Sequence, residues 1–202
     1  IALNPRVAVA HNNLGSAYLA VGRTAEAIEH YREAVRLERE YVDARYNLAN
    51  AYAQTGQPGL AEELYREALV LDPRHVPARK NYGALLVSQG RTGEAIGEYE
   101  TALRLRPEAA VARALSALYL APGRNRNLAR AVERARYAVQ LSGGQDAASL
   151  GTLAIALQAT GQTAEAETTA RQAIALARST GQELLAREIE QAMSGAVTAP
   201  SQ

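Results

Sequence analysis

The sequence has no cysteine, a single lysine and almost no net charge. Without cysteine the chain can form no disulfide, thiolate nucleophile or cysteine-based metal site, and it fits a reducing or an oxidising compartment equally well. The formal charge of +1 provides no overall field that would favour nucleic acid or a membrane surface. No apolar run approaches the roughly 20 residues that a membrane-spanning helix needs. These absences exclude several classes of function, so the arrangement of the remaining residues has to carry the interpretation.

The basic residues are almost all arginine, since Lys80 is the only lysine among 22. We attribute this bias to a GC-rich bacterial genome rather than to function. Hydrophobic residues make up 48% of the chain and charged residues 21%, which is the composition of an ordinary folded protein.

A unit of 34 residues, seen most clearly at 42–75, repeats along the chain. Residues of one kind recur at this spacing: Leu3, Leu37, Leu71 and Leu105; Tyr31, Tyr65 and Tyr99; Gly22, Gly56 and Gly90; and Ala27, Ala61 and Ala95. Within 42–75, apolar positions recur at i, i+3 or i+4 and i+7 on both sides of a break at 55–57. This is the one-face periodicity of amphipathic helices, so the sequence predicts a stack of helix–turn–helix units.

We divide the chain according to this spacing. The predicted units are 8–41, 42–75, 76–109, an irregular unit with an insertion at 110–145, and 146–180, followed by a capping helix at 182–194 and a disordered tail at 195–202. The capping helix is expected because Leu184, Leu185 and Ile189 form an apolar stripe on an otherwise charged segment. Residues 1–7 match the end of a repeat, so we expect at least part of another repeat upstream in a longer protein.

The repeated motif resembles the tetratricopeptide repeat family. It consists of Leu followed by Gly or Ala, a large residue three positions later, Ala-x3-aromatic and a final Pro; in the second unit these are Leu48, Ala49, Tyr52, Ala61, Tyr65 and Pro73. The motif recurs in register three times. At the position of the family's Trp, the chain instead has His11, Arg45, Arg79 and Arg113.

The resemblance implies an all-α fold, a right-handed α-solenoid of about five helix–turn–helix repeats plus the capping helix. It also implies a concave groove, lined by the first helix of each repeat, that binds peptides in extended form. Small residues at the repeated positions would let helix backbones approach closely. We expect most of the tyrosine rings to fill the gaps between helices, with their hydroxyls bonded, rather than to stack on nucleic-acid bases.

An asparagine series is the strongest candidate for a binding site. Asn13, Asn47 and Asn81 occupy one position in three consecutive units, although asparagine is unfavourable inside a helix. A carboxamide can bond both the N–H and the C=O of a peptide backbone, and the row resembles the asparagine ladder in the groove of O-linked N-acetylglucosamine transferases. The alternative is that these residues form structural hydrogen bonds between repeats, or that the repeats are recent copies. The series ends after the third unit, because Leu115 and Thr152 occupy the later positions.

Other candidate peptide-binding residues flank this row on the same helices: Asn12, Ser16, Tyr46, Asn50 and Lys80. The family's other known mode, a carboxylate clamp for chaperone C-termini, fits poorly. Asn12 and Pro77 stand where that clamp has Lys, and Asn81 stands where it has Arg.

Two features of the later units each allow two interpretations. Val111, Leu115, Leu118 and Ile155 form either an apolar sub-site for a partner or a surface that neighbouring structure covers.

Eight arginines lie between 104 and 136: Arg104, Arg106, Arg113, Arg124, Arg126, Arg130, Arg134 and Arg136. We interpret this basic stripe as a solvated helix face rather than a nucleic-acid or phosphate site, because no aromatic residues repeat beside it.

Nothing in the sequence indicates catalysis, a cofactor or a metal. His11, His30 and His75 are scattered without metal-ligand spacing, and no glycine-rich phosphate loop follows a strand. We therefore expect a protein-interaction scaffold whose ligand is a protein or an extended peptide. The alternative is a substrate-recruiting arm of a larger enzyme such as a glycosyltransferase. Self-association through the N-terminal end is a further prediction.

Overall fold

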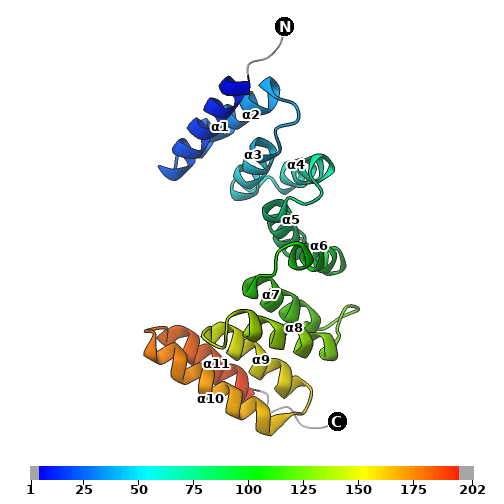
Figure 1. The fold of residues 1–202 in the computed structure, drawn as a ribbon, viewed down its shortest axis with the longest axis vertical. Helices are drawn as coiled ribbons and strands as arrows, with labels where there is room; N and C mark the ends of the chain where they lie inside the picture. Colours follow the sequence, from blue (N-terminus) through cyan, green and yellow to red (C-terminus); the bar gives the residue numbers. More distant parts are fainter. Residues whose placement is uncertain (1–4, 196–202) are drawn as a thin grey trace. The chain divides into compact units, whose positions relative to one another are not determined.

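The computed structural model describes residues 5–195, and these residues form helices without any β-strand (Figure 1). In order they are α1 (Pro5–Ala20), α2 (Thr24–Leu37), α3 (Val42–Gln54), α4 (Pro58–Leu71), α5 (Val76–Ser88), α6 (Thr92–Leu105), α7 (Ala109–Leu120), α8 (Leu128–Leu141), α9 (Ala147–Ala159), α10 (Thr163–Ser179) and α11 (Glu183–Gly195). The all-α prediction is confirmed. Residues 5–7 belong to α1, while the rest of the predicted N-terminal remnant and the predicted tail beyond 195 lie outside the described residues.

The chain divides into two compact units, Ile1–Glu98 and Tyr99–Gln202, with the boundary inside α6. In the first unit α1 packs on α2 and α3 packs on α4, and α3 also contacts α2. In the second unit α7 packs on α8 and α9 packs on α10, while α11 contacts both α9 and α10. Each unit therefore contains stacked helical hairpins whose helices pack mainly on their neighbours in sequence.

The short turns inside the hairpins depend on glycine. Gly22 follows α1 with φ of 77°, and Gly56 follows α3 with φ of 74°. In the first turn the Gly22 N–H donates to the Leu19 carbonyl at 3.0 Å, and the Arg23 N–H donates to the Tyr18 carbonyl at 2.9 Å. This left-handed ending closes the last turn of the helix and reverses the chain, which explains why glycine recurs every 34 residues.

Close helix packing in the first unit uses small residues against tyrosine rings. Ala27 and Ala34 on α2 are fully buried, and the Tyr31 ring lies between them in sequence and is also buried. A Cβ atom on Gly15 would lie 2.7 Å from Cε1 of Tyr31, so only glycine lets the ring approach α1 this closely. Tyr65 fills the matching position on α4 with 2% of its surface exposed. The predicted packing role of these tyrosines is confirmed.

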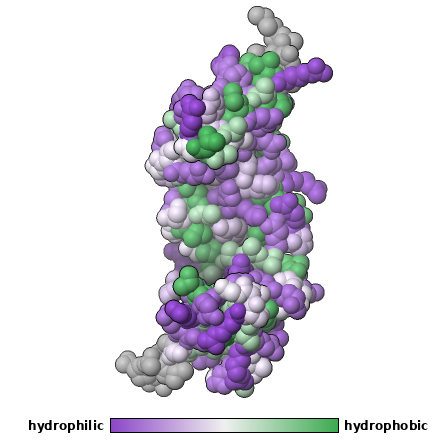
Figure 2. Space-filling view, turned by 90° about the vertical axis from the view of Figure 1, so that its left-hand side faces the viewer, coloured by the Kyte–Doolittle hydropathy of each residue, from purple (hydrophilic) through white to green (hydrophobic). Residues whose placement is uncertain are grey.

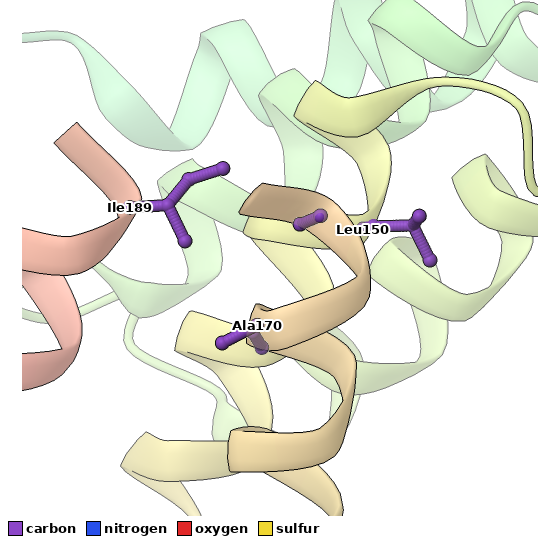
Figure 3. Packing of buried hydrophobic residues seen from close by; sticks show 5 residues of the cluster. Leu150, Ala170 and Ile189 are labelled. Carbon is purple, nitrogen blue, oxygen red and sulfur yellow. The ribbon is translucent and has the colours of Figure 1, made fainter. Parts of the chain in front are cut away.

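The second unit is closed by α11 (Figure 3). Ile189 on α11 packs against a cluster that includes Leu150 on α9 and Ala170 on α10. A Cβ atom on Gly151 would lie 2.7 Å from Cδ1 of Ile189, so the absence of a side chain there lets α11 approach α9. Leu184, which was predicted to belong to the buried stripe, is instead 76% exposed because it lies on the outer side of α11.

The surface carries no single large apolar area in the view of Figure 2, where hydrophobic and hydrophilic side chains alternate. Val21 and Leu184 are exposed as single large apolar side chains, whereas Val70 and Leu71 are exposed next to each other at the end of α4. Single exposed apolar residues are normal for folded proteins.

Candidate functional site: asparagine side chains on α1, α3 and α5

The structure places Asn13 on α1, Asn47 on α3 and Asn81 on α5. Asn13 is exposed, and the other two are half-buried. The bonds that these carboxamides already form within the protein decide which of their atoms can still bond a ligand.

Asn47 and Asn81 each bond back to the preceding hairpin in the same way. Nδ2 of Asn47 donates to Oδ1 of Asn12 at 2.9 Å, and Nδ2 of Asn81 donates to the hydroxyl of Tyr46 at 3.2 Å. Asn12 and Tyr46 are themselves one repeat apart, so the contact is repeated along the unit. This is the structural bond between repeats that the sequence left open as an alternative. Asn12 is only 7% exposed and is a buried partner rather than a groove residue.

A second bond ties Asn81 into the core. Nδ2 of Asn81 also donates to Oδ1 of Asn50 at 2.8 Å, and the same oxygen accepts the Tyr65 hydroxyl at 2.5 Å. Burial raises the pKa of the Tyr65 phenol far above its ordinary value, and the nearby Tyr46 adds to this effect. The phenol therefore stays protonated and acts as a donor, which fixes the orientation of the Asn50 amide.

These amides line a cavity of about 370 Å³ between α3 and α5. Its walls are Asn50, Ala53, Gln54, Tyr65, Asn81, Ala84, Leu85 and Ser88. None of these side chains is charged: three carry carboxamides, two carry hydroxyls, and the other three are alanine or leucine. Such a lining suits an uncharged ligand that both donates and accepts hydrogen bonds.

Part of the hydrogen-bonding capacity of the amides remains unused. Within residues 5–195, the carboxamide oxygens of Asn47 and Asn81 accept no bond from another side chain, and Nδ2 of Asn50 donates none. The nitrogens of Asn47 and Asn81 are therefore structural, while their oxygens and the Asn50 nitrogen can still meet a ligand.

The other predicted residues, among them Ser16, Lys80 and Tyr46, are not part of the lining of this cavity. Ser16 on α1 donates to the Asn12 carbonyl at 3.1 Å, and its hydroxyl lies 3.1 Å from that of Tyr31. Lys80 is half-buried on α5, next to Asn81 in sequence. Tyr46 contributes only its hydroxyl to the Asn81 contact.

In the second unit, the positions that correspond to the asparagine series are apolar or form a hydrogen bond within their own helix. Val111 and Leu115 are buried, and the Thr152 hydroxyl donates to the Ala148 carbonyl of its own helix at 2.8 Å. Leu118 is half-buried, and Ile155 is 36% exposed. Burial of Val111 and Leu115 favours the interpretation that neighbouring structure covers this surface, so it offers little room for an apolar sub-site.

Four of the eight arginines of the basic stripe pair with carboxylates. Arg106 pairs with Glu108, Arg113 with Asp146, Arg134 with Glu100 and Glu133, and Arg136 with Glu165. Arg130 lies over the Tyr119 ring and donates to its hydroxyl at 3.0 Å. These pairings support the interpretation of the stripe as a solvated helix face.

Another cavity, of about 770 Å³, lies along α4. Its charged groups are mostly paired, since Arg45 bonds Glu67 at 3.0 Å and Glu62 bonds Arg91 at 2.7 Å. Size alone does not indicate a ligand here. In the described part of the chain no group of three or more potential metal ligands is present, and no helix is long and apolar enough to cross a membrane.

One contact between histidines was not predicted from the sequence. His11 on α1 and His30 on α2 face each other with 3.0 Å between their Nδ1 atoms. The same spacing of 19 residues brings Arg79 to Glu98, whose atoms Nη1 and Oε2 are 2.6 Å apart. Two of the four residues at the family's Trp position, His11 and Arg79, therefore meet the residue 19 positions later, whereas Arg45 pairs with Glu67, 22 positions later. The 34-residue repeat contains this spacing, but the contact can be predicted only when the geometry of the turn between the two helices is known.

The comparisons with known proteins agree with this architecture. Family models described as tetratricopeptide repeat match residues 4–76, 54–119 and 147–180. A search of curated proteins finds no match.

Three solved structures illustrate the similarity of fold. MamA from Desulfovibrio magneticus RS-1 is 22% identical with a TM-score of 0.75, covering 85% of this chain and 96% of its own. YrrB, described as a TPR protein with an unusual peptide-binding site, is 16% identical with a TM-score of 0.73, covering 91% and 92%. The first TPR of Spaghetti (RPAP3), bound to an HSP90 peptide, is 24% identical with a TM-score of 0.56, covering 58% and 94%. The chain belongs to the tetratricopeptide repeat family.

Proposed function

We propose that the first unit binds an extended segment of a partner protein along α1, α3 and α5. Asn13, Asn47 and Asn81 form the row, and Asn50 supplies a donor beside it. In this proposal the chain acts as a binding module: its residues bind the partner segment and do not catalyse a reaction.

The observation that carries this proposal is the uncharged cavity with unused amide groups. A peptide backbone presents N–H and C=O groups alternately, and the free oxygens of Asn47 and Asn81 with the Asn50 nitrogen complement both. The amides are already held in place by their bonds to neighbouring helices. Little side-chain entropy would be lost when a ligand binds, so this preorganisation favours affinity.

Two of the similar structures have peptide ligands or peptide sites in their descriptions, YrrB and the Spaghetti (RPAP3) domain. Their similarity to this chain is one of fold, so they support peptide binding as a class and say nothing of the ligand's sequence.

A blocking variant tests the proposal without breaking the amide network. Ala84 is exposed and lines the cavity, so Ala84→Glu would introduce bulk and charge there. The matched control is Ala175→Glu, on an exposed position of α10 in the second unit. The probes are peptides selected against the unmodified chain from a random library of unstructured peptides.

We expect the selected peptides to bind Ala84→Glu at least about tenfold more weakly, equivalent to about 1.4 kcal/mol, and to bind the control unchanged. Asn13→Ala should weaken binding in the same direction, because its amide is exposed at the start of the row. Equal affinity for Ala84→Glu and the unmodified chain would overturn the proposal.

A further inference from the structure

The first helix of the chain exposes a stripe of apolar side chains. Along α1 and the turn after it, the stripe consists of Val7, Ala10, Leu14, Ala17 and Val21, at alternating spacings of three and four residues. All five are exposed, and Leu14 and Val21 expose 44% and 70% of their surface. Residues at these spacings lie on one side of a helix, and the same spacings form the seam of a coiled coil.

The later hairpins bury the residues that correspond to this stripe. The counterparts of Ala10, Leu14 and Ala17 in α3, α5, α7 and α9 expose no more than 8% of their surface: Ala44, Leu48 and Ala51; Ala78, Tyr82 and Leu85; Ala112, Ser116 and Tyr119; and Ser149, Leu153 and Ala156. The second helix of one hairpin contacts the first helix of the next, as α2 does with α3, α4 with α5 and α8 with α9. The stripe of α1 is therefore one side of an interface that later hairpins close with a helix.

We propose that a second copy of the chain supplies this helix, so that two copies form a dimer in which their α1 helices pack antiparallel. A contact about a two-fold axis needs a surface that complements itself. The stripe does so, because large and small side chains alternate along it. With the helices antiparallel, Leu14 of each copy can lie opposite Ala10 of the other copy, and Val7 opposite Ala17. Each of these large side chains then meets an alanine, which lets the helices approach closely.

The charges of α1 favour this pairing and its direction. The helix contains no lysine, aspartate or glutamate, and Arg6 is its only arginine. Charged residues are depleted at the centre of protein interfaces, and the stripe has none. Arg6 lies near the start of α1. Antiparallel helices would therefore hold the two Arg6 side chains apart, whereas parallel helices would place these like charges side by side.

The last described helix does not offer a surface that matches the stripe. The side of α11 that exposes Leu184 also exposes Glu183, Arg187 and Glu188. Packing this side on the stripe would remove charged groups from water without giving them partners. Head-to-tail association through α1 and α11 is therefore disfavoured, and the pairing of α1 with α1 is complete after two copies. We expect dimers and no larger assemblies.

The size of the surface sets the strength of the dimer. A helix of 16 residues is about 24 Å long. Two such helices packed side by side bury less than the roughly 1,600 Å² of a standard protein interface, so we expect a dissociation constant in the micromolar range. The inference does not use the proposed peptide site. Its test therefore needs no ligand, and either proposal can fail without the other.

Sedimentation equilibrium on the full chain tests the dimer, at concentrations between about 1 and 200 µM, which bracket micromolar affinity. Leu14→Glu places a charge at the centre of the stripe, at a position that is exposed in the single chain, and should weaken dimerisation by at least about tenfold. Leu184→Glu is the matched control, because it also replaces an exposed leucine by glutamate but lies on α11, and it should dimerise like the unmodified chain. Ala17→Glu is a second stripe variant in case Leu14→Glu does not fold, which circular dichroism detects.

A spin label tests the direction of the helices. The chain has no cysteine, so a label on Arg6→Cys is attached at a single site in each copy. The antiparallel pairing separates the two labels by about 18 Å along the helix axis, whereas a parallel pairing would bring them side by side.

Three results would overturn the inference. The first is a chain that stays monomeric throughout the concentration range, which would leave the stripe as a surface for a preceding hairpin of a longer protein. The second is equal dimerisation of Leu14→Glu and Leu184→Glu, which would place the contact elsewhere on the chain. The third is a pair of adjacent labels, which would exclude antiparallel packing.

Discussion

At the scale of single residues, the asparagine side chains divide their hydrogen-bonding groups between two tasks. Nδ2 of Asn81 bonds Asn50 and Tyr46, while its oxygen is unused by other side chains of the described residues. Asparagine can do this because one planar group carries a donor and an acceptor. The bonds of Nδ2 to neighbouring helices explain why asparagine is tolerated inside a helix. The oxygen can still accept a hydrogen bond from a ligand, as the proposed function requires.

Replacing Asn81 with alanine should therefore lower stability, unlike the same change at Asn13. Asn81→Ala removes two donor contacts and leaves Oδ1 of Asn50 with one partner, so we expect a loss of about 1–3 kcal/mol in the free energy of unfolding. Asn13 is exposed, and Asn13→Ala should change stability by less than about 0.5 kcal/mol. Urea unfolding of both variants measures the difference, and equal stabilities would contradict the structural role.

Tyr65 gives a residue-scale prediction for alkaline pH. Burial raises the pKa of its phenol, so the neutral form is favoured by folding. The raised pKa therefore adds to the free energy of unfolding below about pH 10, the ordinary pKa of a tyrosine. This contribution is lost as the pH rises through the higher pKa of the folded state.

An ultraviolet titration can isolate this phenol, because the chain has no tryptophan. Tyr65→Phe should remove the most alkaline phenolate step and leave the others. Tyr137→Phe, at a half-buried ring of the second unit, should leave that last step in place. If the last step persists in Tyr65→Phe, another tyrosine is responsible for it.

At the scale of helices, some glycines lie where another helix packs closely against them, and others lie where there is room for a side chain. Gly151 on α9 is in contact with Ile189 of α11, whereas a Cβ atom added to Gly97 in α6 would meet no neighbouring atom within 4 Å. The same substitution should therefore have opposite effects at the two sites.

Gly151→Ala should destabilise the second unit by about 1–3 kcal/mol, because α11 must shift or Ile189 must change rotamer. Gly97→Ala should stabilise the protein by about 0.5–1 kcal/mol, because alanine is the better helix former. Thermal unfolding followed by circular dichroism measures both. A neutral result at Gly151 would mean that α11 adjusts at little cost.

At the scale of the whole molecule, each hairpin is stabilised mainly by its neighbours. Contacts in the solenoid are local in sequence, and α11 contacts α9 and α10. The loss of one element should therefore weaken the adjacent helices more than distant ones.

A chain ending at Thr180 tests this locality. Removing α11 uncovers the cluster that contains Leu150, Ala154 and Ala173. Amide hydrogen exchange should speed up in α9 and α10, while α1 to α4 keep their protection. A uniform loss of protection across both units would show that the array unfolds as one cooperative block.

The 34-residue period by itself determined the helices, the turns and the family, because a helical hairpin buries its apolar face only against a neighbour of the same kind. Burial of the repeated tyrosines was predictable for the same reason. The exposure of Leu184 was not, since an apolar residue at the margin of a stripe can lie on either side of a helix.

Only the tertiary structure decided what the polar side chains do. Sequence spacing placed Asn47 and Asn81 on one face, but it could not show which amide atom bonds a neighbouring helix and which remains free. Nor could it show that His11 meets His30, because their contact depends on how two helices are set against each other across the turn at Gly22. A hydrogen bond tolerates a variation of only a few tenths of an ångström in its donor–acceptor distance, and packing rather than periodicity sets that distance.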